Sequence, residues 1–144
     1  MKKSFDILMV GIGGQGIILA SNILGEACLL EQRSVRGAET HGMAQRGGSV
    51  EGHIRIDGLY GPLIPPGAAD LIIAFDLLEA LRYSHYLAPG GRMVTNTTMV
   101  MPTSVFTQKV PAPTPGEISG RLPGQAVCRV DADRMAEEAG SPLT

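Results

Sequence analysis

The sequence predicts a single Rossmann-like α/β domain with a mostly parallel sheet and helices on both of its faces. Short apolar runs typical of buried strands recur at residues 5–10, 69–75 and 92–95. Segments with helical spacing of apolar residues separate these runs. The first run passes through a glycine-rich turn directly into a helix, which is how an α/β sheet begins. The 144 residues are expected to form one domain over 1–144.

The first half of the chain is expected to hold two strands and a long helix. Residues 5–10 are nearly all apolar, which favours a strand buried on both faces. Residues 17–31 follow as a helix, because apolar side chains recur there at three- and four-residue spacing. Residues 32–49 are polar and rich in glycine, and we expect a long loop there. Residues 50–56 alternate apolar and polar side chains, as a half-buried strand does.

The middle of the chain repeats the strand-and-helix pattern. Residues 69–75 form the second strongly apolar run, and Asp76 follows as the expected cap of a helix over 77–87. The sequence Pro89-Gly90-Gly91 is expected to stop that helix. Residues 92–95 then predict a third core strand, which ends at Asn96.

The last third is harder to assign. Residues 102–124 contain five prolines and are expected to form a loop with at most an edge strand. Residues 125–130 predict a strand. Residues 131–139 predict the beginning of a helix, with Gly140 as its stop signal.

Composition and charge narrow the class of function. The formal net charge is −2 and the basic residues are scattered, which argues against a nucleic-acid partner. No apolar stretch reaches the roughly 18 residues that a membrane span needs, and no signal-peptide pattern is complete. We therefore expect a cytoplasmic protein with no membrane contact.

The chain lacks a self-contained catalytic set. Cys28 and Cys128 are expected to be small apolar side chains, since an iron–sulfur cluster takes four cysteines and nothing indicates an oxidising compartment. The three histidines show no metal-ligand spacing. A P-loop, a zinc-protease motif and a nucleophile elbow are all absent from the sequence.

The first candidate site is the glycine turn, residues 11–16. Gly11, Gly13 and Gly16 satisfy G-x-G-x-x-G between a strand and a helix, where backbone N–H groups can hold an anion. A dinucleotide site also needs an acidic residue about 20 positions further on, and 32–36 offers none. Three interpretations stay open: a dinucleotide site, a purely structural turn, and contact with another ligand or a partner subunit.

The second candidate is the segment Glu39–Gly48. Arg46 beside Gly47 and Gly48 can present a planar donor fork to a phosphate or carboxylate, and His41 can exchange a proton near neutral pH. The alternative is an ordered loop whose side chains satisfy its own backbone. Asp76 and Asn96 follow core strands, where they either face a ligand at the sheet edge or cap a helix.

These two segments together resemble a known family. The sequence is similar to the beta subunit of indolepyruvate ferredoxin oxidoreductase, a relative of the gamma subunit or domain of 2-oxoacid:ferredoxin oxidoreductases. The likeness rests on Val10–Gly16 and on His41–Gly48. Further agreement lies at Ala69–Phe75, Glu79–Arg82 and Leu87–Asn96.

The resemblance implies a non-autonomous subunit of an oxidoreductase. The complex would convert a 2-oxo acid, for this type indolepyruvate or another aryl pyruvate, and coenzyme A to an acyl-CoA and CO₂ while reducing ferredoxin. Thiamine diphosphate and iron–sulfur clusters would sit in a large alpha subunit, so this chain alone would bind no cofactor. By analogy, residues that face coenzyme A or the partner would be Gly11, Gly13, Gly14, Gln15, Gly16, His41, Gln45, Arg46, Gly47, Gly48 and Asn96.

Two further expectations follow from the resemblance. Family members usually continue with additional helices, so the gamma-type domain of 1–144 is expected to lack the usual C-terminal helices. The alternative function is a stand-alone nucleotide-binding or regulatory module that has kept the fold without a catalytic partner.

Overall fold

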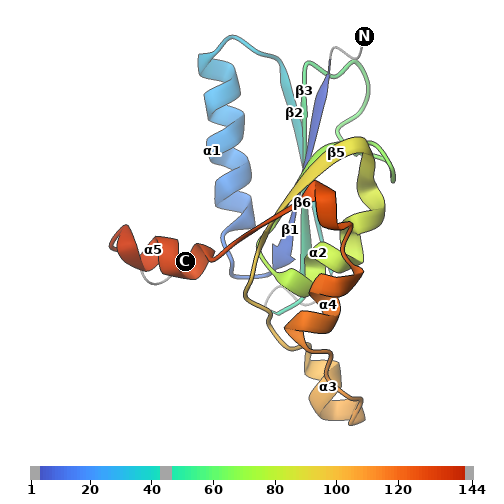
Figure 1. Cartoon of the computed structure of the whole chain (residues 1–144). Coiled ribbons are helices and arrows are strands. Elements are labelled where there is room, and N and C mark those ends of the chain that lie inside the picture. Colours follow the sequence, from blue (N-terminus) through green and yellow to red (C-terminus); the bar gives the residue numbers. More distant parts are fainter. Residues whose placement is uncertain (1–3, 43–46, 142–144) are drawn as a thin grey trace.

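A computed structural model describes residues 4–42 and 47–141 of the chain. Six strands form one sheet in the order β2-β3-β1-β4-β5-β6 (Figure 1). The strands are β1 (Phe5–Ile12), β2 (Val35–His41), β3 (Ser49–Ile56), β4 (Ala69–Ala74), β5 (Leu87–Asn96) and β6 (Val127–Val130). The helices are α1 (Ile17–Leu30), α2 (Leu77–Tyr83), η1 (Ser84–Tyr86), α3 (Thr103–Gln108), α4 (Pro115–Arg121), η2 (Gly124–Ala126) and α5 (Ala132–Glu138).

The sheet is mostly parallel, as the sequence predicts. Strand β1 pairs in parallel with β4, β4 with β5, and β5 with β6. The remaining two pairings are antiparallel, because β3 pairs antiparallel with both β1 and β2. Strand β3 therefore lies between the first two strands of the chain.

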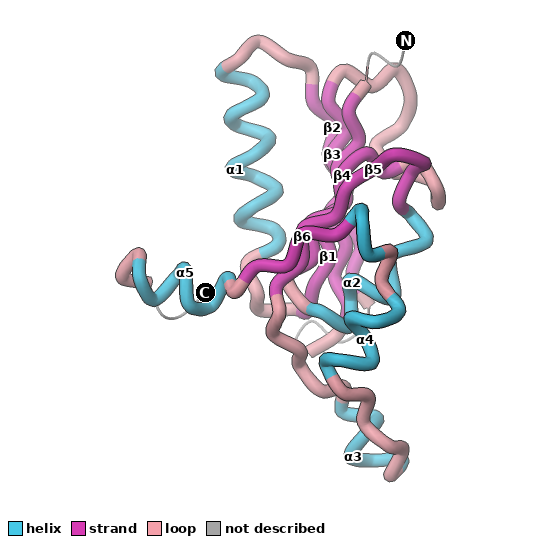
Figure 2. Tube along the Cα trace, in the orientation of Figure 1, coloured by secondary structure: helices cyan, strands magenta, loops and turns pink. Residues whose placement is uncertain are grey.

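Helices cover both faces of the sheet. Helix α1 lies on one face, over β1, β2 and β3, whereas α2 and α4 lie on the other (Figures 1 and 2). The alternation of side chains along β1 gives each face its own core. Leu8 and Val10 pack on the side of α2 and α4, and Ile7 and Met9 pack on the side of α1. Helices α3 and α5 project from the body and bury no side chain.

The expectation of a loop over 32–49 is wrong for its central part, where β2 forms. Strand β2 lies at the edge of the sheet, and its side chains are half-buried or exposed. Its sequence therefore needs no apolar run. Its order comes from backbone hydrogen bonds to β3, which polar residues provide as well as apolar ones. Residues 43–46 of the expected loop lie outside the described residues.

The expectation for 102–124 is also wrong, because α3 and α4 form there. Pro115 stands at the first turn of α4, where its missing N–H is not needed. The Thr114 side chain accepts from the Glu117 N–H, and the Glu117 carboxylate accepts from the Thr114 N–H. Proline is therefore compatible with the start of a helix here, at the N-cap of α3 and in the first turn of α4.

The expected helix over 77–87 is shorter than predicted. Helix α2 ends at Tyr83, η1 follows, and β5 already begins at Leu87. The expected stop, Pro89-Gly90-Gly91, lies within β5, where the pairing with β4 is irregular. Asp76 caps α2 as predicted, and Gly140 follows α5 with a φ of +86°. Across the described ranges, no helix is long and apolar enough to cross a membrane.

Candidate functional site

The glycine turn connects β1 to α1 and requires glycine for two separate reasons. Gly14 and Gly16 have φ angles of +104° and +80°, which L side chains rarely adopt. Gly11 is buried, and a Cβ there would lie 2.7 Å from Gln15 Oε1 and 2.7 Å from Ile17 Cδ1. Gly14 and Gly16 therefore shape the turn, and Gly11 allows helix α1 to approach strand β1.

The side chain of Gln15 closes this turn from inside. Its Oε1 accepts from the Ile12 N–H at 2.8 Å, and its Nε2 donates to the Phe75 carbonyl at 3.5 Å. The amide group is thus already engaged with the backbone of β1 and of the residue after β4. A contact of Gln15 with a ligand stays a prediction.

The N-terminus of α1 opens onto a hollow of about 680 Å³. Gly16 precedes the helix, no side chain of the described residues caps it, and its first turn contains no acidic residue. The N–H groups of the first turn and the positive end of the helix dipole favour an anion there. The hollow is lined by Gly13, Gly14, Gly16, Ile17, Ile18, Leu19, Asn22, His41 and Val50.

The structure brings the two glycine motifs together. The Gly13 N–H donates to the Gly48 carbonyl at 2.9 Å, which fixes the start of β3 against the glycine turn. His41 lines the hollow at α1 and also a second hollow of about 460 Å³. The second hollow is lined by Thr40, His41, Gly42, Ser49, Glu51 and Tyr83. Gln45 and Arg46, two of the expected site residues, lie outside the described residues.

Asn96 does not line the hollow at the N-terminus of α1. Its Oδ1 accepts from the Ala132 N–H at 3.0 Å, and its Nδ2 donates to Asp133 Oδ2 at 3.5 Å. It lines a smaller hollow of about 190 Å³, which Gln15 also lines. Asn96 therefore anchors the start of α5, and a ligand contact there stays a prediction.

A polar cluster that the sequence did not predict borders the second hollow. Glu79 and Arg82 lie on α2, and Arg82 Nη1 donates to Glu79 Oε1 at 2.8 Å and to Ser49 Oγ at 3.3 Å. Glu79 is only 1% exposed, and its Oε2 has no hydrogen-bond partner among the described residues. Burial raises the pKa of the Glu79 carboxyl above its usual value. The three-residue spacing of Glu79 and Arg82 was visible in the sequence, but the position of Ser49 beside them was not.

A second part of the cluster centres on Glu51. Its Oε1 accepts from the Tyr83 hydroxyl at 2.7 Å. The Ile64 N–H donates to His53 Nδ1, so the imidazole proton lies on Nε2, which faces Glu51 Oε2 at 3.1 Å. Both oxygens of Glu51 are therefore occupied by donors. Burial and the adjacent Glu51 raise the pKa of the Tyr83 hydroxyl.

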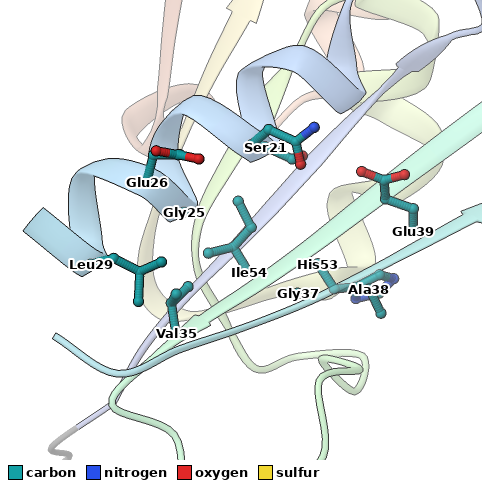
Figure 3. A pocket seen from close by; sticks show the side chains of 11 residues that line it. Ser21, Gly25, Glu26, Leu29, Val35, Gly37, Ala38, Glu39, His53 and Ile54 are labelled. Carbon is teal, nitrogen blue, oxygen red and sulfur yellow. The ribbon is translucent and has the colours of Figure 1, made fainter.

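A groove between α1 and β2 is the least suited to an anion. It has a volume of about 500 Å³, and Glu26 and Glu39 line it from opposite sides (Figure 3). Ser21, Gly25 and Gly37 are small residues that keep it open. The two carboxylates would repel a phosphate, so we place the candidate anion site at the N-terminus of α1.

The sheet order also argues against a dinucleotide site of the usual Rossmann kind. Such a site needs an acidic residue on the second strand, adjacent to the first. Glu39 lies on the second strand of the chain, but β3 separates that strand from β1. The acidic side chain lines the groove on α1 instead of the hollow at the glycine turn.

Comparison with known proteins shows the family to which this chain belongs. The family model described as pyruvate ferredoxin/flavodoxin oxidoreductase matches residues 6–144. The chain belongs to this family and is an oxidoreductase subunit. It is 44% identical over 140 residues to indolepyruvate oxidoreductase subunit IorB of Archaeoglobus fulgidus, which covers 96% of this chain and 70% of the relative. The IorB subunit of Thermococcus kodakarensis is 40% identical, over 99% of this chain and 72% of its own length.

Solved structures have the same fold. Pyruvate oxidoreductase subunit PORC of Thermotoga maritima superposes with a TM-score of 0.71 at 23% identity, over 99% of this chain and 70% of its own. The 2-oxoglutarate:ferredoxin oxidoreductase of Magnetococcus marinus was solved with 2-oxoglutarate, coenzyme A and succinyl-CoA bound. It superposes with a TM-score of 0.68 at 21% identity, and the match covers 99% of this chain and 22% of that chain. At such low identity these likenesses concern the fold alone.

Proposed function

We propose that this chain is the small subunit of an indolepyruvate:ferredoxin oxidoreductase. The observation that carries the proposal is the 44% identity to an IorB subunit over nearly the whole chain. In the reaction, the carboxylate carbon of the 2-oxo acid leaves as CO₂ and two electrons pass to ferredoxin. The acyl carbon bonds to the sulfur of coenzyme A, and the thiol proton is released.

The redox cofactors belong to a large partner subunit in this proposal. Cys28 is buried on α1 and Cys128 is exposed on β6, so the cysteines of this chain do not fit an iron–sulfur cluster. The parts of the chain that the structure describes contain no group of three or more His, Cys, Asp and Glu residues that could hold a metal ion. The thiamine diphosphate and the clusters would therefore come from the partner, in a cytoplasmic complex.

This chain would contribute a surface for coenzyme A or for the partner. The hollow at the N-terminus of α1 supports this role, because it combines backbone N–H donors with the apolar side chains of Ile18 and Leu19. An extended thiol coenzyme needs both kinds of contact, donors for its phosphates and apolar contacts for its pantetheine arm. Gly13 to Gly16 and His41 would be the contact residues.

Co-purification from native cells under anaerobic conditions, followed by an activity assay, tests this proposal. We expect a brown, iron-containing large subunit to accompany this chain, and the complex to reduce ferredoxin with indolepyruvate and coenzyme A. Pyruvate and 2-oxoglutarate serve as substrate controls and should react more slowly. A colourless chain without a partner, whose Tm rises with NAD or another nucleotide, would instead support the stand-alone nucleotide-binding module.

A further inference from the structure

We propose that Arg82, held in position by Glu79, binds a phosphate group of coenzyme A beside the two glycine motifs. The inference rests on the proposed function and adds a residue to it. Arg82 is on the last turn of α2, and its guanidinium contacts Ser49 at the start of β3. Ser49 directly follows Gly48, whose carbonyl holds the Gly13 N–H. The guanidinium therefore lies within one residue of the point where the two motifs meet.

The buried position of Glu79 indicates a role in orienting Arg82. A carboxylate that is 1% exposed loses its hydration, and one of its oxygens has no described partner to replace it. Such a buried charge contributes little net stability, because desolvation offsets the attraction of the pair. The contact does, however, fix the direction of a guanidinium whose side chain remains 48% exposed.

Arg82 keeps donors free for a ligand. A guanidinium has five N–H donors, and the two described hydrogen bonds of the Arg82 guanidinium both use Nη1. The donors on Nε and Nη2 have no partner among the described residues. Parallel donors of this kind match two oxygens of a phosphate. The Arg82 side chain is thus held by Glu79 and Ser49 through Nη1, and its Nε and Nη2 donors can bind a ligand.

Neighbouring groups favour an extended anion over a single carboxylate of a partner protein. Ser49, which the Arg82 guanidinium contacts, lines the second hollow, and this hollow shares His41 with the hollow at the N-terminus of α1. We therefore expect a ligand with several phosphate groups, such as coenzyme A with its diphosphate and 3′-phosphate, to reach from one hollow to the other. Glu51 lines the second hollow, but both of its oxygens accept hydrogen bonds from Tyr83 and His53, which lowers its repulsion.

The test uses the anaerobically purified complex of this chain with its large subunit. For Arg82→Ala we expect the KM for coenzyme A to rise roughly 10- to 100-fold while kcat changes little, as for loss of a charge-assisted contact. Arg82→Lys should recover part of the loss, because it keeps the charge without the planar fork. Glu79→Gln should raise this KM less than Arg82→Ala does.

Arg33→Ala is the matched control. Arg33 is also an exposed arginine that donates to a carboxylate, at 2.7 Å from Asp57, but it lies beyond the C-terminal end of α1. Its KM for coenzyme A should equal that of the wild type. If Arg82→Ala leaves a buried unpaired carboxylate and unfolds, Glu79→Gln/Arg82→Ala removes that charge and carries the test.

The outcomes separate the two proposals. A wild-type complex that oxidises no 2-oxo acid overturns the proposed function. An active complex in which Arg82→Ala leaves the KM for coenzyme A unchanged overturns only the inference. Weaker subunit assembly with an unchanged KM also overturns it and points to a carboxylate of the partner. With dephospho-coenzyme A as a probe, a loss that persists assigns the diphosphate, and a loss confined to coenzyme A assigns the 3′-phosphate.

Discussion

At the scale of single residues, the carboxyl group of Glu79 links the fold to the candidate site. It lies at the base of the polar cluster, where burial disfavours its charged form. Its pKa is raised in the folded chain, so the folded state binds this proton more tightly than the unfolded state does. The stability that this group contributes is therefore fully present below the ordinary pKa of 4.5 and is lost as the pH rises through the folded pKa.

We predict that Glu79→Gln stabilises the isolated chain at pH 7, raising its Tm by a few degrees. The neutral amide resembles the protonated carboxyl, so its advantage should shrink as the pH falls toward 4. Thermal unfolding between pH 4 and pH 8 measures this difference.

Glu138→Gln provides the control for this titration. Glu138 pairs with Arg134 in the same way, at 2.9 Å, but both side chains are largely exposed. Its effect on the Tm should be small at every pH, because exposed pairs contribute little. If the difference in Tm between Glu79→Gln and the wild type does not change with pH, the raised pKa of the Glu79 carboxyl is contradicted.

At the scale of elements, Asp76 shows how one side chain fixes the junction of β4, α2 and the segment after β5. Its Oδ1 accepts from the N–H groups of Leu78 and Glu79, and its Oδ2 accepts from the Val100 N–H at 2.6 Å. Asp76 is fully buried, so water cannot replace these bonds. The cap therefore also sets the position of Glu79 and of the polar cluster.

We predict that Asp76→Ala lowers the free energy of unfolding by about 2–4 kcal/mol, because three backbone donors lose their acceptor. Asp76→Asn should lose less, since it keeps one carbonyl oxygen. Asp131→Ala is the control: Asp131 also caps a helix, α5, but is exposed, so the loss should be about 1 kcal/mol. Urea denaturation gives these values, and equal losses for Asp76→Ala and Asp131→Ala would count against a buried junction.

At the scale of the whole molecule, the two cores on opposite faces of the sheet hold the site in place. The glycine turn follows β1, which contributes to both cores, and α2 packs on one face only. Helix α1 is apolar on its outer side as well, where Leu19, Ile23 and Leu30 are exposed. The stability of the isolated chain therefore depends on the buried layers and not on this outer surface.

We predict that Leu8→Ala, which removes a fully buried side chain of β1, lowers the free energy of unfolding by about 2–5 kcal/mol. Leu30→Ala should change it by less than about 0.5 kcal/mol, because Leu30 is 85% exposed. Chemical denaturation of both variants checks the difference. Similar losses for the two would be inconsistent with the described layers.

The sequence by itself determined the features that depend on near neighbours. The apolar run of β1, the glycine turn, the helical spacing of α1 and the cap at Asp76 are each encoded within a few residues. Local patterns of this kind do not predict strand β2 or helix α4. The first is stabilised by pairing with β3, and the second begins at a proline that resembles a loop signal.

The tertiary structure alone decided which distant segments meet. Pairing placed β3 between β1 and β2, which moved Glu39 away from the glycine turn and joined Gly13 to Gly48. Packing of α2 then brought Arg82 against Ser49, 33 positions away in the sequence. Local patterns cannot encode such contacts, because strand order and helix docking are set by hydrogen bonds and burial between segments that are far apart in the chain.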